Sequence, residues 1–222
     1  MKIEDNLIAD IVKQVVNQLS QNNLDSQTKL NRMGVNSSRG GEMVLEESGK
    51  AVKGHNPKEV GIGIGPAYGK TIGHTINGLD VMDVLKEMMA GIEEEGMIPR
   101  VVRVTRTSDV CFMGNDTAKL MGSGIAVGLQ SKGTAVIHQK DLYPLTNLEL
   151  FPQAPLLTLE IYRIIGRNAA KYAKGEMVLP VATQNDPMVR PKYQVKAALM
   201  HTVETELVRD RGDMIEIQVK EK

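Results

Sequence analysis

Short apolar runs alternate with longer segments of helical periodicity along most of this chain, and this alternation restricts the fold more than any other feature. Strand-like composition is found at residues 59–65, 100–105, 125–129, 133–137 and 214–219. Amphipathic helices are predicted over residues 79–95 and 156–174, which end at Gly96, a candidate left-handed cap, and at Gly175. A short helix is expected at residues 117–121, and regular structure continues over 195–208. Strands that alternate with helices predict a three-layer α/β domain.

The N-terminal part of the chain differs from the rest. Residues 1–19 form a predicted amphipathic helix, with apolar side chains three and four positions apart. Residues 20–57 are rich in Asn, Ser, Gly and charge, as in a flexible linker. The globular domain is therefore expected at 58–222. The helix either packs back onto this domain or docks its apolar stripe in a partner's groove.

Composition excludes several classes of function. Lys and Arg total 27 and Asp and Glu total 27, so no net charge favours nucleic acid or an anionic membrane. Aromatic residues make up 3% of the chain and Trp is absent, which leaves few platforms for stacking bases. No apolar run is long enough to span a bilayer, and no signal peptide is recognised. A soluble cytoplasmic protein is expected.

No catalytic or metal-binding constellation is apparent. The histidines are far apart, and none has a metal-ligand spacing to an acidic residue or to Cys111, the single cysteine. Cys111 is interpreted as a buried, inert thiol on or beside a strand. Gly61 to Gly65 imitates a dinucleotide fingerprint, but Pro66 takes the place of the last glycine. Close backbone packing is the favoured interpretation of these glycines.

Residues 122–138 and 147–155 instead suggest a surface that binds a large ligand. These segments place glycines, one lysine and prolines in loops between apolar runs. Lys132 is flanked by Ser131 and Gly133, where the backbone turns, and a lysine there suits a phosphate. The polar residues in otherwise apolar or glycine-rich loops are Asp109, Lys132, Asn147 and Arg190, each of which is interpreted either as a ligand contact or as a surface charge or loop cap.

Several runs resemble the medium (beta) subunit of adenosylcobalamin-dependent propanediol dehydratase. The resemblance covers nearly all of residues 58–205 and is weak in the linker and in the final segment. The runs that carry it are residues 91–96, 108–110, 122–125, 128–133, 136–139, 147–160 and 190–193.

The resemblance implies an α/β/α sandwich with a mixed central sheet, like the anticodon-binding domains of class II synthetases. It implies a dimer of heterotrimers that converts 1,2-propanediol to propionaldehyde, and often glycerol to 3-hydroxypropionaldehyde. The large subunit, a TIM barrel, performs the radical rearrangement. The medium subunit contacts the nucleotide loop of adenosylcobalamin (coenzyme B12), and a small subunit completes the trimer.

The resemblance also implies which residues contact the cofactor. By motif position these are Asp109, Lys132, Leu145, Asn147, Pro152 and Arg190, with Ser131 and Pro155 as secondary contacts. A cation suits the phosphate, and prolines form rigid apolar walls. No residue of this chain is expected to be catalytic. His138 is not implied as a cobalt ligand, because this family binds the cofactor with its own base retained.

In this family, the N-terminal helix and linker resemble an encapsulation peptide that directs the enzyme into a bacterial microcompartment through shell proteins. Glycerol dehydratases tend to have a shorter medium subunit, so the extension favours the diol enzyme. Two alternatives stay open: the medium subunit of a glycerol dehydratase, and the small subunit of a dehydratase-reactivating factor, a non-enzymatic relative of the same fold.

Overall fold

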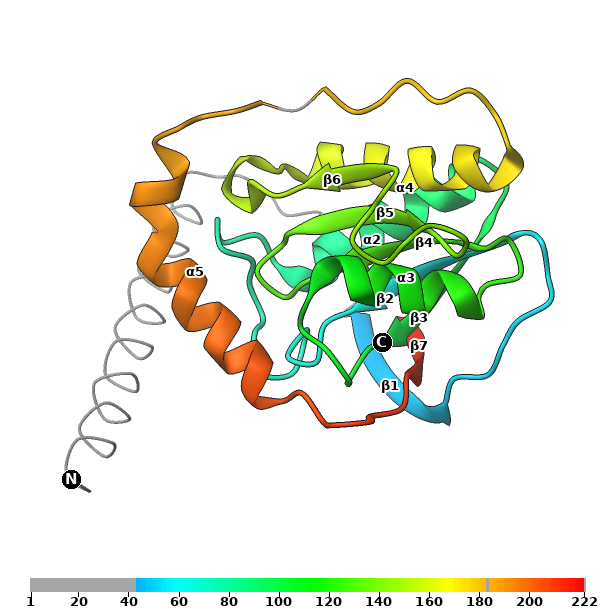
Figure 1. Ribbon diagram of the computed structural model, residues 1–222, viewed down its shortest axis with the longest axis horizontal. Helices are drawn as coiled ribbons and strands as arrows, with labels where there is room; N and C mark the ends of the chain where they lie inside the picture. Colours follow the sequence, from blue (N-terminus) through cyan, green and yellow to red (C-terminus); the bar gives the residue numbers. More distant parts are fainter. Residues whose placement is uncertain (1–42, 183, 222) are drawn as a thin grey trace. The chain divides into compact units, whose positions relative to one another are not determined.

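A mixed seven-stranded sheet is the centre of the fold (Figure 1). The computed structural model describes residues 43–182 and 184–221. The strand order is β1-β7-β3-β2-β4-β5-β6, in which β2 pairs in parallel with β3 and β4, and the remaining pairs are antiparallel. The strands are β1 (Met43–Lys50), β2 (Glu59–Ile64), β3 (Ile98–Arg103), β4 (Ile125–Leu129), β5 (Ala135–Gln139), β6 (Glu149–Phe151) and β7 (Ile215–Glu221).

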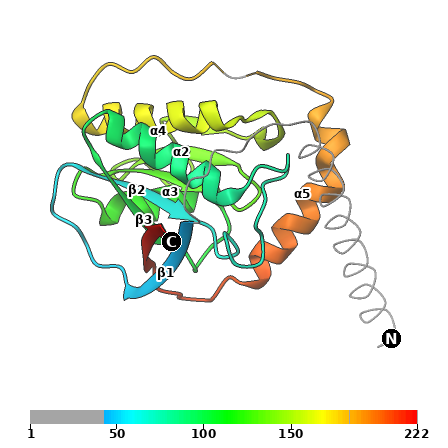
Figure 2. The same ribbon diagram turned by 180° about the vertical axis from the view of Figure 1, so that it is seen from behind.

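Helices α2 (Val81–Glu94) and α4 (Leu159–Lys174) cover one face of the sheet (Figure 2). Their side chains share one apolar core with alternate residues of the central strands. The two helices approach closely because each places a glycine at the contact. A Cβ atom on Gly166 would lie 2.2 Å from the Met88 carbonyl oxygen, and one on Gly91 would lie 2.1 Å from the Arg163 carbonyl oxygen.

Helix α3 (Val110–Leu120) covers the opposite face, where the sheet presents small residues. A Cβ atom on Gly63 would lie 2.1 Å from the Thr117 hydroxyl, and one on Gly128 would lie 2.5 Å from the Val110 carbonyl oxygen. The glycines of β2 therefore allow the helix to approach the sheet, which confirms the packing interpretation of residues 61–65. Helices on both faces also confirm the three-layer α/β class.

Helix α5 (Val189–Glu206) lies beside the ends of the strands and covers neither face of the sheet (Figure 1). Its buried residues are Val189 and Glu204. Near its C-terminal end, the Glu204 carboxylate contacts the loops that follow β2 and β4. The helix is thus positioned at the carboxyl edge of the parallel strands, together with a 3-10 turn, η1 (Ala154–Leu156).

The boundary of the globular unit differs from the prediction. Residues 43–50 of the predicted linker form β1, which pairs with β7, and the next residue donates from Ala51 N to the Met214 carbonyl at 2.8 Å. The compact unit therefore begins at Met43 and not at residue 58. The predicted helix at 1–19 and the linker up to residue 42 lie outside the described residues.

Three further elements were mispredicted. Helix α3 begins at Val110, so Cys111 lies in its first turn, half-buried, and not on a strand. Helix α5 begins at Val189 and not near residue 195, and β6 was not predicted. Both glycines expected at helix ends are left-handed, with φ of +73° at Gly96 and +72° at Gly175.

Candidate functional site at the carboxyl edge of the sheet

A pocket of about 380 Å³ lies at the carboxyl edge of the parallel strands and brings together four of the predicted cofactor contacts. Lys132 comes from the turn between β4 and β5, Pro152 and Pro155 from the segment that follows β6, and Arg190 from the first turn of α5. This Lys132 pocket therefore joins segments that are distant in the sequence.

The turn that carries Lys132 (residues 130–134, the β4–β5 turn) is tightly closed. Gly133 N donates to the Gln130 carbonyl at 2.8 Å, and Gln130 N donates to the Thr134 carbonyl at 2.9 Å. Gly133 has a φ of +103°, a conformation that side chains disfavour, and a Cβ atom there would lie 2.6 Å from the Tyr162 hydroxyl. The Tyr162 hydroxyl donates to the Gly133 carbonyl at 2.7 Å, and because Tyr162 belongs to α4, this bond holds the turn against that helix.

The pocket is cationic. Lys132 and Arg190 line it, and none of its lining residues is acidic. Neither cation forms an ion pair with any residue in the described part of the chain. Burial lowers the pKa of Lys132, and the negative charge of Glu204 opposes this shift. A half-buried cation without a carboxylate partner is poised to attract an anion.

Helix α5 is tied to the β4–β5 turn directly through Glu204 and indirectly through Ile76. The Glu204 carboxylate accepts from the Ser131 hydroxyl at 2.6 Å and from the Ser131 backbone N at 3.2 Å. Lys196 Nζ donates to the Ile76 carbonyl at 2.7 Å, while Ile76 N donates to the Lys132 carbonyl at 3.0 Å. The predicted secondary contact Ser131 is itself buried, and its hydroxyl holds the turn against α5.

Asp109 lies at the same edge of the sheet but does not line the pocket. Its carboxylate caps α3 and accepts from the backbone N atoms of Cys111 at 2.9 Å and Phe112 at 3.0 Å. The loop containing Asp109 stays close to the β4–β5 turn because Gln130 Nε2 donates to the Ser108 carbonyl at 2.5 Å.

Leu145 and Asn147 lie away from the Lys132 pocket. They belong to the loop between β5 and β6, which meets the sheet where Gln139 pairs with Ile125, at the start of β4. Leu145 is 60% exposed and Asn147 is half-buried. The structure thus separates these two predicted contacts from the four that gather around Lys132.

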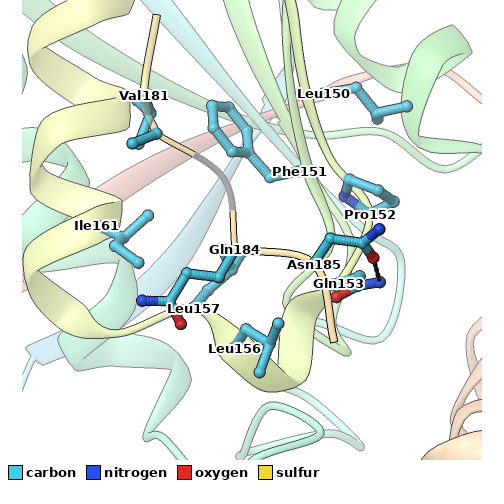
Figure 3. Close-up of a pocket in the computed structure, with 11 residues that line it drawn as sticks. Leu150, Phe151, Pro152, Gln153, Leu156, Leu157, Ile161, Val181, Gln184 and Asn185 are labelled. Atoms are coloured by element: carbon cyan, nitrogen blue, oxygen red, sulfur yellow. Dashed lines mark hydrogen bonds between the residues drawn. The ribbon is translucent and has the colours of Figure 1, made fainter. Parts of the chain in front are cut away.

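A second pocket, of about 370 Å³, shares Pro152 and Gln153 with the Lys132 pocket (Figure 3). Its walls are mainly apolar and include Phe151, Ile161 and Val181. At its rim, Gln153 Nε2 donates to Asn185 Oδ1 at 2.6 Å (Figure 3). An apolar surface therefore adjoins the cationic pocket.

Sequence reasoning missed several residues of the Lys132 pocket: Ile76, Thr134, Gln153, Tyr193 and Gln194. A helix assigned from residue 189 would have placed Arg190, Tyr193, Gln194 and Ala197 on one face, since residues three and four apart are neighbours on a helix. The sequence predicts only regular structure of no stated type, and only from residue 195, so this helix face was not recognised. Thr134 adjoins the glycine of the turn, and nothing else in the sequence marks it.

The other reactive side chains lie outside the pocket. His138 is fully buried on β5, where its Nδ1 lies 2.8 Å from the Gln139 carbonyl oxygen and its Nε2 lies 3.2 Å from that of Pro144. Burial raises the pKa of the Cys111 thiol. Over the described residues, no cluster of three His, Cys, Asp or Glu side chains is arranged to hold a metal ion. No described helix is both long and apolar enough to cross a membrane.

A family model for the dehydratase medium subunit matches residues 65–178 of this chain. The chain belongs to the dehydratase medium subunit family. It is accordingly a component of a multi-subunit dehydratase, with large and small subunits as partners. The matched range includes every predicted contact except Arg190, which follows it in α5.

Two solved structures are also similar to this medium subunit. One, described as a glycerol dehydratase reactivase, has 16% identity and a TM-score of 0.43, and the match covers 57% of this chain and 96% of the other. The second is a diol dehydratase-reactivating factor complexed with ADP and Mg²⁺. It has 20% identity and a TM-score of 0.40, and the match covers 61% and 100% of the two chains. The family assignment comes from the sequence match alone.

Proposed function

We propose that this chain is the medium subunit of an adenosylcobalamin-dependent diol dehydratase, which converts 1,2-propanediol to propionaldehyde and water. In this proposal, the compact unit Met43–Lys222 contacts the cofactor, and the Lys132 pocket receives the phosphate of the cofactor's nucleotide loop. The observation that carries the proposal is a pocket with two cations and no acidic side chain, inside a chain of the medium subunit family.

The residues present fit such a ligand. Lys132 and Arg190 supply positive charge for a phosphodiester, while Pro152 and Pro155 supply rigid apolar walls. Asp109 and Ser131 lie in loops at the same edge of the sheet. The side chains of both form hydrogen bonds within the protein. Leu145 and Asn147 remain proposed contacts for a more distant part of a large ligand.

The role of this chain in the reaction is to bind and orient. Bound adenosylcobalamin supplies the radical chemistry, and that step belongs to the large subunit in this proposal. Lys132 holds a phosphate charge, and the β4–β5 turn keeps that lysine at the pocket. The preference for a diol over glycerol is proposed from the N-terminal extension, which also suggests a microcompartment location.

The first test is to coexpress the full chain with large and small dehydratase subunits and to measure adenosylcobalamin binding by the purified complex. Lys132→Ala is expected to weaken binding by about 1–3 kcal/mol, the scale of a charge-assisted hydrogen bond left unmade. Lys119→Ala, which changes an exposed lysine of α3, is the matched control. A chain that copurifies with neither subunit, or equal affinity in both variants, contradicts the proposal.

A further inference from the structure

Thr134 presents a buried hydroxyl that the protein does not satisfy. Its side chain is only 6% exposed, and its Oγ1 has no hydrogen-bond partner among the described residues. A buried polar group without a partner costs stability, so such groups are uncommon unless they serve another purpose. Thr134 also lines the Lys132 pocket.

A neighbouring threonine shows the contrast. Thr75 is also buried, and its Oγ1 donates to Asn77 Oδ1 at 2.6 Å and accepts from Leu79 N at 3.1 Å. Both threonines lie near Gly133, so the local fold satisfies one hydroxyl and leaves the other unpaired beside the pocket.

The backbone at Thr134 is fixed, and burial restricts the rotamers that its side chain can adopt. Its carbonyl accepts from Gln130 N at 2.9 Å, and the next residue, Ala135, pairs with Leu129 and Phe151 in the sheet. A group held in this way loses little conformational freedom when a ligand binds, which favours hydrogen bonding to that ligand.

We propose that Thr134 is a further ligand-binding residue of this pocket, whose hydroxyl donates a hydrogen bond to the phosphate-class anion attracted by Lys132 and Arg190. This inference rests on the proposed function, which identifies the anion as the phosphodiester of the cobalamin nucleotide loop. A phosphodiester accepts hydrogen bonds through its unesterified oxygens and donates none. The pocket offers it two cations, Lys132 and Arg190, and its lining includes the hydroxyl groups of Thr134 and Tyr193.

The test compares Thr134→Val, which keeps the shape and removes the hydroxyl, with Thr134→Ser, which keeps the hydroxyl. Both are made in the complete dehydratase complex, and binding of adenosylcobalamin is measured by equilibrium dialysis in the dark. Thr134→Val is expected to bind roughly tenfold more weakly, or worse, and Thr134→Ser within about threefold of wild type. Thr117→Val is the control, because that buried hydroxyl donates to the Met113 carbonyl at 2.8 Å and lies outside the pocket.

A second ligand identifies the group that is recognised. Adenosylcobinamide lacks the nucleotide and its phosphodiester, so Thr134→Val is expected to bind it as wild type does. Urea unfolding of the full-length chain supplies a readout that is independent of the ligand. There, Thr134→Val is expected to be at least as stable as wild type, because it removes an unpaired buried hydroxyl.

The possible failures can be told apart. If Lys132→Ala weakens adenosylcobalamin binding but Thr134→Val binds like wild type, the role of Thr134 is overturned and the proposed function stands. If Thr134→Val weakens both ligands equally, its effect is structural and the inference is overturned as well. If neither Lys132→Ala nor Thr134→Val changes binding, the proposed function fails together with the inference.

Discussion

The Glu204 carboxylate in α5 accepts a hydrogen bond of 2.6 Å from the Ser131 hydroxyl in the β4–β5 turn. This bond joins the C-terminal helix to the residue next to Lys132, so the two walls of the pocket are linked through a buried acid. Burial raises the pKa of Glu204, although the bonds to Ser131 and the charges of Lys132 and Arg103 oppose the shift.

Glu204→Gln is expected to change how stability depends on pH. Because the pKa of Glu204 is higher in the folded chain than in the unfolded chain, the folded state favours the protonated acid. The stability that this residue contributes is therefore complete below the unfolded pKa of 4.5 and is lost as the pH rises through the folded value. The glutamine cannot ionise. The free energy of unfolding of Glu204→Gln, relative to that of wild type, should therefore increase as the pH rises over that range.

Urea unfolding of both full-length chains at a series of pH values measures this difference. Glu206→Gln, an exposed position in the same helix, is the control and should follow wild type. A constant difference between Glu204→Gln and wild type across the series would show that Glu204 does not titrate as described.

Arg190→Ala is expected to weaken the binding of adenosylcobalamin to the complex by about 0.5–1.5 kcal/mol. This loss is smaller than that for Lys132→Ala, because Arg190 is exposed and its charge is screened by solvent and salt. The loss should shrink as salt is added. Lys192→Ala is the control, since this residue is adjacent in α5 but does not line the pocket. Binding isotherms at low and high sodium chloride decide the point, and equal losses in the two variants would argue against a specific role for Arg190.

Gly166→Ala is expected to destabilise the fold by about 1–3 kcal/mol, despite the higher helix propensity of alanine. The added Cβ atom would lie 2.2 Å from the Met88 carbonyl oxygen, so α2 and α4 would have to separate. The free energy of unfolding in urea measures the effect. Gly73→Ala is the matched control, because nothing lies within 4 Å of its Cβ position, and it should change stability by no more than about 0.5 kcal/mol. Similar stability in both variants would refute tight helix packing.

Deletion of residues 1–20 is expected to leave subunit assembly, cofactor binding and activity of the purified complex intact, and to release the enzyme from microcompartments into the cytosol. The physical reason is that the sequence of residues 1–19 predicts an amphipathic helix, and such a helix can dock its apolar side in a groove of another protein. Fractionation of cells that express the full-length and truncated chains measures the change. Loss of activity in the purified truncated complex would contradict this role.

The sequence predicts the central strands and helices α2 and α4 because their side chains are buried in a regular pattern. Helix α3 was found only in its last turns, since Gly114 and Asn115 are weak helix formers whose presence reflects contact with the sheet. Strand β1 was missed because most of its residues are exposed and its pairing partner, β7, is at the other end of the chain. Long-range pairing of this kind leaves no local periodicity to detect.

Part of the lining of the candidate pocket was predictable, where a residue type carries its own chemistry. Lys132 beside a turn glycine suggests an anion site, and the prolines suggest rigid walls. That Arg190 joins them depends on α5, which has two buried residues and hence little apolar periodicity. The unpaired state of the Thr134 hydroxyl depends on every neighbour in three dimensions, and no one-dimensional pattern contains that information.

The Lys132 pocket takes its walls from Ile76, the β4–β5 turn, the segment after β6 and the first turns of α5. As the chain leaves the ribosome, strands β1 to β6 and helices α2, α3 and α4 are made before residue 190 appears. The pocket therefore cannot exist on a nascent chain that lacks its C-terminal helix. Cofactor loading at the complete pocket, in the proposed function, is therefore an event that follows synthesis of α5.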